Sequence, residues 1–137
     1  MDNGKLTGAR IVVVEDESLV SMLLEDMLDD LGCTVVAAAS ELGEATAKLS
    51  SATYDAVILD VNLNGTRTFG IAEMLARSGT PFVFSTGYGA DGIPEHLRTV
   101  PIMGKPFSRR EVERALAAAL DATDASSSRR AEAEPEC

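Results

Sequence analysis

The chain is 137 residues long, enough for one domain with its own core and too short for two ordinary domains. Hydrophobic residues make up 45% of it and charged residues 25%, the mixture of a soluble globular protein. Its formal charge is −10, from 12 basic and 22 acidic residues. Direct nucleic-acid binding is therefore not expected, because phosphate backbones are held by clustered Lys and Arg.

Neither a membrane segment nor a disulfide framework is expected from the sequence. The apolar runs are far too short to span a bilayer, and residues 1–8 lack the apolar core of a secretory signal. The two cysteines, Cys33 and Cys137, are too few for a set of disulfides or a metal site. We expect a cytoplasmic protein in which Cys33 is buried and Cys137 is a free thiol.

Five short apolar runs predict the strands of a sheet. They are continuous rather than alternating, which is typical of strands covered on both faces of a parallel sheet. In chain order they cover residues 10–14, 34–38, 56–59, 82–85 and 101–103.

The stretches between these runs have helical spacing. An apolar ladder of four side chains predicts a first helix that ends at Gly32, where a C-terminal glycine is expected. Weaker helices are predicted over 42–49 and around 71–75. Ser108, with Glu111 three residues later, forms a capping-box pattern for a last helix. The ladder of the first helix consists of Leu19, Leu23, Met27 and Leu31.

Strands that alternate with helices at this pitch predict an α/β fold with right-handed crossovers. We expect a flavodoxin-like (βα)5 domain over residues 8–122, with a five-stranded parallel sheet of order 2-1-3-4-5 flanked by helices. In such a sheet the ligand crevice lies at the carboxyl ends of the first and third strands. Residues 123–137 are rich in Ala, Ser, Arg and Glu without apolar periodicity, and predict a disordered tail.

Polar side chains follow four of the predicted strands. Glu15 and Asp16 follow the first strand, Asp60 the third, Thr86 the fourth and Lys105 the fifth. The carboxyl ends of parallel strands meet at one edge, so these groups are expected to lie together. Crowded carboxylates repel one another, and Mg²⁺ is their natural counter-ion because it prefers oxygen ligands.

In such a site Asp60 can act as a nucleophile toward a phosphoryl group, since aspartyl phosphate is a known product of carboxylate catalysis. Mg²⁺ would neutralise the phosphoryl oxygens, and Lys105 would add a positive donor. Thr86 would offer a hydroxyl to the phosphoryl group once it is in place.

Each residue alone has an ordinary structural explanation. Glu15 and Asp16 can favour the start of the first helix through its dipole. Asp60 can be a turn residue, Lys105 a surface lysine and Thr86 a hydroxyl at a strand end. The functional interpretation depends on all of them occupying the correct strand ends in the correct order.

Four segments resemble the signature segments of two-component response-regulator receiver domains: IVVVEDE, VILDVNLNG, FVFSTGYG and MGKPF. The resemblance implies that Asp60 is the phosphoacceptor and that Glu15 and Asp16 are the acid pair. It also implies that Mg²⁺ is bound by these carboxylates and by the backbone carbonyl of Asn62. Lys105 would be the lysine of the receiver site, which is often followed by a cis proline in this family, and Pro106 follows it here.

Two features depart from the usual receiver pattern. Many receivers carry an aromatic residue where this chain has Ile102, so Tyr88 becomes the switch candidate in its place. The Ser-Thr-Gly-Tyr stretch resembles the Phe-Ala-Thr-Gly-Tyr subgroup of single-domain receivers in alphaproteobacteria, some of which act in general stress signalling.

The resemblance implies a monomeric signalling domain whose only chemistry is its own phosphorylation and dephosphorylation. A histidine kinase or a phosphotransfer protein would supply the phosphoryl group, and a downstream protein target would receive the signal. The glycine-rich segment 87–98 is predicted to hold only a short or fraying helix and to be the mobile output face.

Two alternatives stay open. A haloacid-dehalogenase-like phosphohydrolase also uses an Asp at a strand end with Mg²⁺, but its general acid, two residues later, is here Asn62, which cannot transfer a proton. A receiver-like module that only binds partners is the second alternative.

Overall fold

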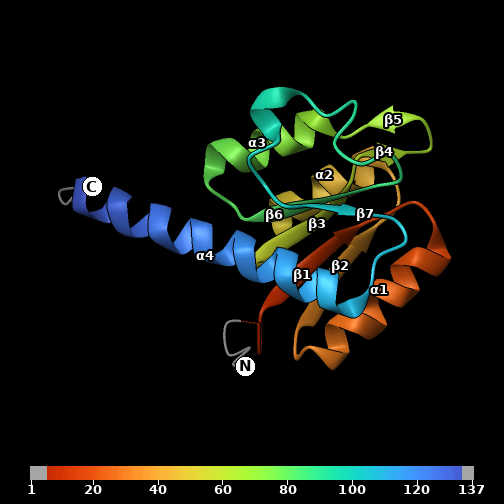
Figure 1. Cartoon of the computed structure of the whole chain (residues 1–137), viewed down its shortest axis with the longest axis horizontal. Coiled ribbons are helices and arrows are strands. Elements are labelled where there is room, and N and C mark those ends of the chain that lie inside the picture. The colour runs from red at the N-terminus through yellow and green to blue at the C-terminus, as the bar shows by residue number, and fades with distance from the viewer. Residues whose placement is uncertain (1–5, 134–137) are drawn as a thin grey trace.

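A five-stranded parallel sheet forms the centre of the molecule (Figure 1). The computed structural model describes residues 6–133 of the chain, with side chains described up to residue 121. The strand order is β2-β1-β3-β6-β7. Because β6 and β7 are the fourth and fifth of the predicted strands, this confirms the predicted order 2-1-3-4-5. Its strands are β1 (Arg10–Val14), β2 (Thr34–Ala39), β3 (Ala56–Asp60), β6 (Phe82–Thr86) and β7 (Ile102–Gly104).

Each face of the sheet is covered by its own pair of helices. One face packs under α2 (Leu42–Ser51) and α3 (Phe69–Ser78), and the other under α1 (Ser18–Asp30) and α4 (Arg109–Ala133). Successive side chains of a strand point to opposite faces, so one strand contributes side chains to the cores on both sides of the sheet. In β1, Val12 and Val14 join the α2 and α3 side, whereas Ile11 and Val13 join the other side.

Helix α1 presents a different face to the sheet than the apolar ladder predicts. Leu19 and Leu23 are 75% and 54% exposed, whereas Leu24 and Leu28 are fully buried. Each step of four residues turns the helix by about 40°. A ladder of such steps therefore drifts around the helix, and its first members face solvent while Met27 is partly buried against the sheet.

The predicted ends of two helices are confirmed. Gly32 follows α1 with a φ of 87°, a conformation that favours glycine, and the N–H of Cys33 donates to the Leu28 carbonyl at 2.9 Å. At the start of α4 the Ser108 N–H donates to Glu111 Oε1 at 2.8 Å, and the Glu111 N–H donates to Ser108 Oγ at 3.2 Å. Both bonds of the capping box are formed.

Helix α4 continues to Ala133 and extends past the sheet, away from the carboxyl ends of the strands (Figure 1). The structure thus has helix over residues 123–133, where the sequence predicts a disordered tail. The stretch continues α4 without any Gly or Pro to end the helix, and it holds three Ala and two Arg, which are good helix formers. Residues 134–137 lie outside the described residues, and the domain boundary at 122 stays a prediction.

The connection between β6 and β7 contains no α-helix within residues 87–101. Its only regular element is the 3-10 helix η1 (Glu95–Leu97), so the predicted short helix is confirmed. Buried Ile93 and Leu97 anchor the connection to the core on the α2 and α3 side. Four α-helices rather than five therefore accompany the strands over residues 6–133.

A short antiparallel hairpin, β4 (Asn62–Leu63) with β5 (Thr66–Arg67), follows β3 and lies above the edge of the sheet (Figure 1). Cys33 is buried as predicted. Among residues 6–133, no helix is both long and apolar enough to cross a membrane.

Candidate phosphoacceptor site

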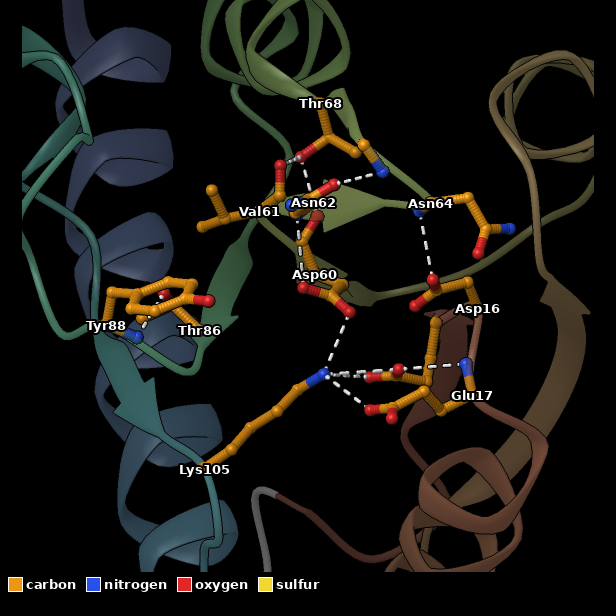
Figure 2. A network of polar contacts seen from close by, with 12 residues as sticks. Asp16, Glu17, Asp60, Val61, Asn62, Asn64, Thr68, Thr86, Tyr88 and Lys105 are labelled. Carbon is orange, nitrogen blue, oxygen red and sulfur yellow. Dashed lines mark hydrogen bonds and ion pairs between the residues drawn. The ribbon is translucent and has the colours of Figure 1, made fainter.

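The polar residues predicted at the strand ends meet at one edge of the sheet (Figure 2). Glu15 directly follows β1, Asp60 and Thr86 are the last residues of β3 and β6, and Lys105 directly follows β7. The registers of the parallel strands align Asp60 with Ser85, and Thr86 with Gly104. The sheet thus holds the backbone of each group at the same level.

Lys105 connects the carboxylates of the site (Figure 2). Its Nζ lies 2.9 Å from Asp60 Oδ2 and 3.0 Å from Glu15 Oε1. Glu17 Oε1 lies 3.5 Å away on the solvent side. Burial alone would lower the pKa of Lys105, but the hydrogen bonds to Asp60 and Glu15 raise it, so the lysine stays charged.

Glu15 is buried beside a second negative group, which makes its ionised form costly. Burial raises the pKa of Glu15 to about 7, and the charge of Asp60 adds to the increase. The Glu17 N–H, which donates to Glu15 Oε2 at 3.0 Å, and the charge of Lys105 oppose it. The ionised pocket would therefore be stabilised by a further cation.

Three carboxylates are placed to bind such a cation. Glu15, Asp16 and Asp60 each offer one oxygen, and these oxygens lie within 4.8 Å of one another. Glu15 Oε1 is buried without a directed hydrogen bond, although it forms an ion pair with Lys105. An all-oxygen set of this kind fits Mg²⁺, which keeps several waters and needs few protein ligands.

The residues around Asp60 orient its carboxylate. The Asn62 N–H donates to Asp60 Oδ1 at 3.1 Å, and Lys105 holds the other oxygen. On the rim, the Asn64 N–H donates to Asp16 Oδ2 at 2.9 Å, which links the loop after β3 to the loop after β1. The predicted role of the Asn62 carbonyl as a metal ligand stays a prediction.

Thr68 supports the site and was not singled out from the sequence. Its side chain is fully buried, and Oγ1 donates to the Asp60 carbonyl at 2.6 Å and lies 3.2 Å from the Val61 carbonyl (Figure 2). Thr68 stands at the N-cap position of α3, where a threonine usually caps the helix, yet its side chain makes no capping hydrogen bond. Only the tertiary fold shows that this hydroxyl fixes the backbone of the candidate acceptor.

Thr86 and Tyr88 lie on the opposite wall from the acid pair (Figure 2). Thr86 is buried, and its Oγ1 accepts a hydrogen bond from the Tyr88 N–H at 3.0 Å. The Tyr88 side chain is 80% exposed, so its ring is not packed into the core. Ile102, where many receivers carry an aromatic, is partly buried against the core on the α2 and α3 side. The switch role of Tyr88 stays a prediction.

The peptide bond between Lys105 and Pro106 is cis, the isomer that is frequent at this place in receivers. It lies immediately after the residue that connects the carboxylates.

A parallel five-stranded sheet with an acid pair, a central Asp, a Thr and a Lys at one edge is the architecture of a receiver domain in two-component signalling. The sequence model of the response regulator receiver domain matches residues 11–117, and the chain belongs to this family.

Three similar proteins illustrate the match. The chain is 40% identical to SdrG from Sphingomonas melonis Fr1, with a TM-score of 0.75 over 88% of this chain and 99% of that chain. It is 26% identical to the PhyR stress response regulator, with a TM-score of 0.70 over 82% of this chain and 45% of that chain. It is 39% identical over 89 residues to the transcriptional regulatory protein TcrA of Mycobacterium tuberculosis, which covers 64% of this chain and 35% of TcrA. The chain thus spans about a third of that curated relative.

Proposed function

We propose that this chain is a single-domain response regulator that accepts a phosphoryl group on Asp60 in the presence of Mg²⁺. The donor is a histidine kinase or a phosphotransfer protein, and the phosphorylated form changes its contacts with a downstream protein. The observation that carries the proposal is the Asp60 carboxylate, which is nearly buried, oriented through both oxygens and placed within 4.8 Å of two further carboxylates.

The chain's own groups suit a phosphoryl transfer. An Asp60 oxygen forms a bond to phosphorus while the phosphorus–nitrogen bond of the donor's phosphohistidine breaks, and the imidazole keeps the electron pair and takes a proton from solvent. Lys105, which in this structure donates a hydrogen bond to Asp60 Oδ2 at 2.9 Å, would donate to a phosphoryl oxygen. Thr86 would turn its hydroxyl from the Tyr88 N–H to the phosphoryl group. Bound Mg²⁺ would neutralise the carboxylates and the phosphoryl oxygens.

Helix α1 supports a role for protein partners at this edge. Leu19, Met22 and Leu23 are large apolar side chains with 75%, 60% and 54% exposure on the helix that follows the acid pair. A cluster of exposed apolar side chains is typical of a contact surface for another protein. We assign this α1 surface to the protein that donates the phosphoryl group.

The biological setting is proposed from the relatives. Similarity to SdrG over almost its whole length supports a protein that works as one receiver domain. Similarity to the PhyR stress response regulator supports a place in general stress signalling. We further propose a cytoplasmic monomer.

Intact-mass spectrometry tests the proposal. Wild type, Asp60→Asn and Asp91→Asn are incubated with Mg²⁺ and acetyl phosphate, and in a second series with a promiscuous histidine kinase. Asp91→Asn is a matched control, because Asp91 lines the same depression but is exposed and is not among the acids paired with Lys105. One phosphoryl group on wild type and on Asp91→Asn, with none on Asp60→Asn, is expected.

Other outcomes favour the alternatives. No adduct with either donor, despite Mg²⁺ binding, would favour a module that only binds partners. Steady release of phosphate from phosphomonoesters would favour a phosphohydrolase.

A further inference from the structure

The depression around Asp60 has more acidic than basic groups on its wall. Lys105 and Arg67 are the cations among its lining residues. Lys105 is already shared by three carboxylates. The acids on the wall are Asp16, Glu17, Asp60 and Asp91.

Arg67 is not engaged in this way. Within the part of the chain that the structure describes, its guanidinium makes no hydrogen bond or ion pair, and its one contact with a charged or aromatic group is with Phe69. The Arg67 Cζ lies 5.9 Å from the centre of the Phe69 ring, a cation–π distance. Phe69 in turn meets the ring of buried Phe84 at 6.3 Å, edge to face. The guanidinium of this exposed side chain is therefore held only by the Phe69 ring and not by an acidic partner.

The backbone brings Arg67 next to the acceptor. Arg67 ends β5 and pairs across the hairpin with Asn62. The Asn62 N–H in turn donates to Asp60 Oδ1 at 3.1 Å. Asn62 thus links the backbone of Arg67 to the carboxylate of Asp60.

Arg67 also reaches the connection after β6. A Cβ added to Gly92 would lie 3.5 Å from Arg67 Nη1, so the guanidinium lies beside the backbone of this glycine. Gly92 has a φ of 86° and is exposed, in the segment that carries no α-helix. Arg67 thus lines the depression around Asp60 and also touches the segment proposed to move.

We propose that Arg67 is a second phosphoryl-binding residue, which turns from Phe69 and Gly92 to the phosphoryl group on Asp60. The inference rests on the proposed function of Asp60. The phosphoryl group carries about −1.5 to −2 charges and three acceptor oxygens, and because it takes the place of the charge of the Asp60 carboxylate, the net gain is about −0.5 to −1. Arg presents a planar fork that matches phosphoryl oxygens with two parallel bonds, and its charge does not depend on pH. Lys105 and Mg²⁺ together bring three positive charges, fewer than the negative charges of the phosphoryl group and the neighbouring carboxylates.

Binding of beryllium fluoride, a mimic of the phosphoryl group, tests this inference in the presence of Mg²⁺. Isothermal titration compares wild type with Arg67→Gln, Arg67→Lys and Arg77→Gln. The last is a matched control, because Arg77 is exposed near the end of α3 and does not line the depression. Arg67→Gln is expected to weaken binding about tenfold, the effect of one lost charge-assisted bond, and Arg67→Lys less than that. Arg77→Gln is expected to bind as wild type does.

Mg²⁺ affinity separates a phosphoryl-binding role from a structural one. Loss of the Arg67 charge leaves Mg²⁺ binding unchanged or slightly tighter, whereas distortion of the hairpin would move Asn62 and weaken it. Equal beryllium fluoride affinity in wild type and Arg67→Gln would overturn the inference and leave the function of Asp60 standing. Weakening of both ligands in Arg67→Gln would also overturn it. If wild type itself failed to bind beryllium fluoride in the presence of Mg²⁺, the inference and the proposed function would both be wrong.

Discussion

The connections that follow β1 and β6 leave the same edge of the sheet and are built in different ways. After β1, residues 15–17 lead directly into α1, and the carboxylates of Glu15 and Asp16 are held by hydrogen bonds. After β6, residues 87–101 contain only η1, and residues 87–92 are all exposed. The first connection presents fixed charges, and the second presents backbone with few contacts.

This difference shows how one edge can combine a precise site with a response. Phosphoryl chemistry needs groups held in place, and here they extend directly from buried strands. A response needs an element of low local stability, whose population shifts when a few kcal/mol are added. The connection after β6 meets that need because residues 87–92 are exposed. It can sense the site because Thr86 directly precedes it and the Arg67 guanidinium lies beside Gly92.

The largest expected effect comes from breaking β6 below the edge. Phe84 is fully buried and meets Phe69 and Phe82 edge to face. Phe84→Ala should lower the free energy of unfolding by about 3–5 kcal/mol, because it leaves a large cavity. Tyr88→Ala, just beyond the edge, should change it by less than about 0.5 kcal/mol. Urea unfolding measures both, and a similar loss in the two variants would contradict the contrast.

Mg²⁺ should stabilise the side of the site that carries the acid pair. At about 100 times its Kd it should add about 2.7 kcal/mol to the free energy of unfolding. Thermal unfolding with and without Mg²⁺ measures this. Asp16→Asn should reduce the gain, whereas Asp91→Asn should keep it. Equal stabilisation of the two variants by Mg²⁺ would show that Asp16 is not a ligand of the metal.

Thr68→Val tests how the end of β3 is fixed. Valine has nearly the same shape but cannot donate to the Asp60 carbonyl, so a buried acceptor loses its bond. The expected loss in the free energy of unfolding is about 1–2 kcal/mol. Thr46→Val is the control, since Thr46 is exposed on α2 and its hydroxyl bonds only within that helix. An equal loss in both variants would show that the Thr68 bond has no special weight.

Two glycine substitutions sharpen the contrast in the backbone. Gly89 has a φ of 66° with open space around it, so Gly89→Ala should cost about 1 kcal/mol through backbone strain alone. Gly70 lies in α3 without positive φ and also has open space, so Gly70→Ala should gain about 0.5–1 kcal/mol. Chemical denaturation checks the opposite signs, and a loss at Gly70 would contradict the account.

The smallest effect on stability is expected from the α1 surface. Leu23→Ser removes an exposed apolar side chain, so the free energy of unfolding should change by less than about 0.5 kcal/mol. Phosphorylation by a histidine kinase should nevertheless slow about tenfold, whereas phosphorylation by acetyl phosphate should stay the same. Leu42→Ser, an exposed leucine on α2, is the control. Equal slowing with both donors would place the effect at Asp60 rather than at the surface.

Much of the fold and the site could be predicted because local signals and topology agree. Continuous apolar runs predicted the strands, and their alternation with helices predicted the strand order, which brings Asp60, Thr86 and Lys105 to one edge. What escaped prediction depends on tertiary packing. The rotation of α1 is set by the sheet beneath it, which buries Leu24 and not Leu23.

The hydroxyl of Thr68 and the guanidinium of Arg67 escaped for the same reason. Each belongs to a polar residue in the short segment between β3 and α3, and nothing in the sequence spacing shows that Thr68 bonds to β3 or that Arg67 lines the depression. The helix over residues 123–133 was not predicted because the prediction required apolar periodicity, whereas the stretch only continues α4 without a Gly or Pro to end it.

Phosphorylation at Asp60 should change the local stability of the connection after β6 and not that of β1. Amide hydrogen exchange, measured on the Mg²⁺-bound protein before and after phosphorylation, reports on both segments in one experiment. We predict slower exchange across residues 87–98, unchanged exchange across Arg10–Val14, and no difference in Asp60→Asn under the same conditions. Unchanged exchange at 87–98 in a protein shown by mass to carry the phosphoryl group would contradict the account.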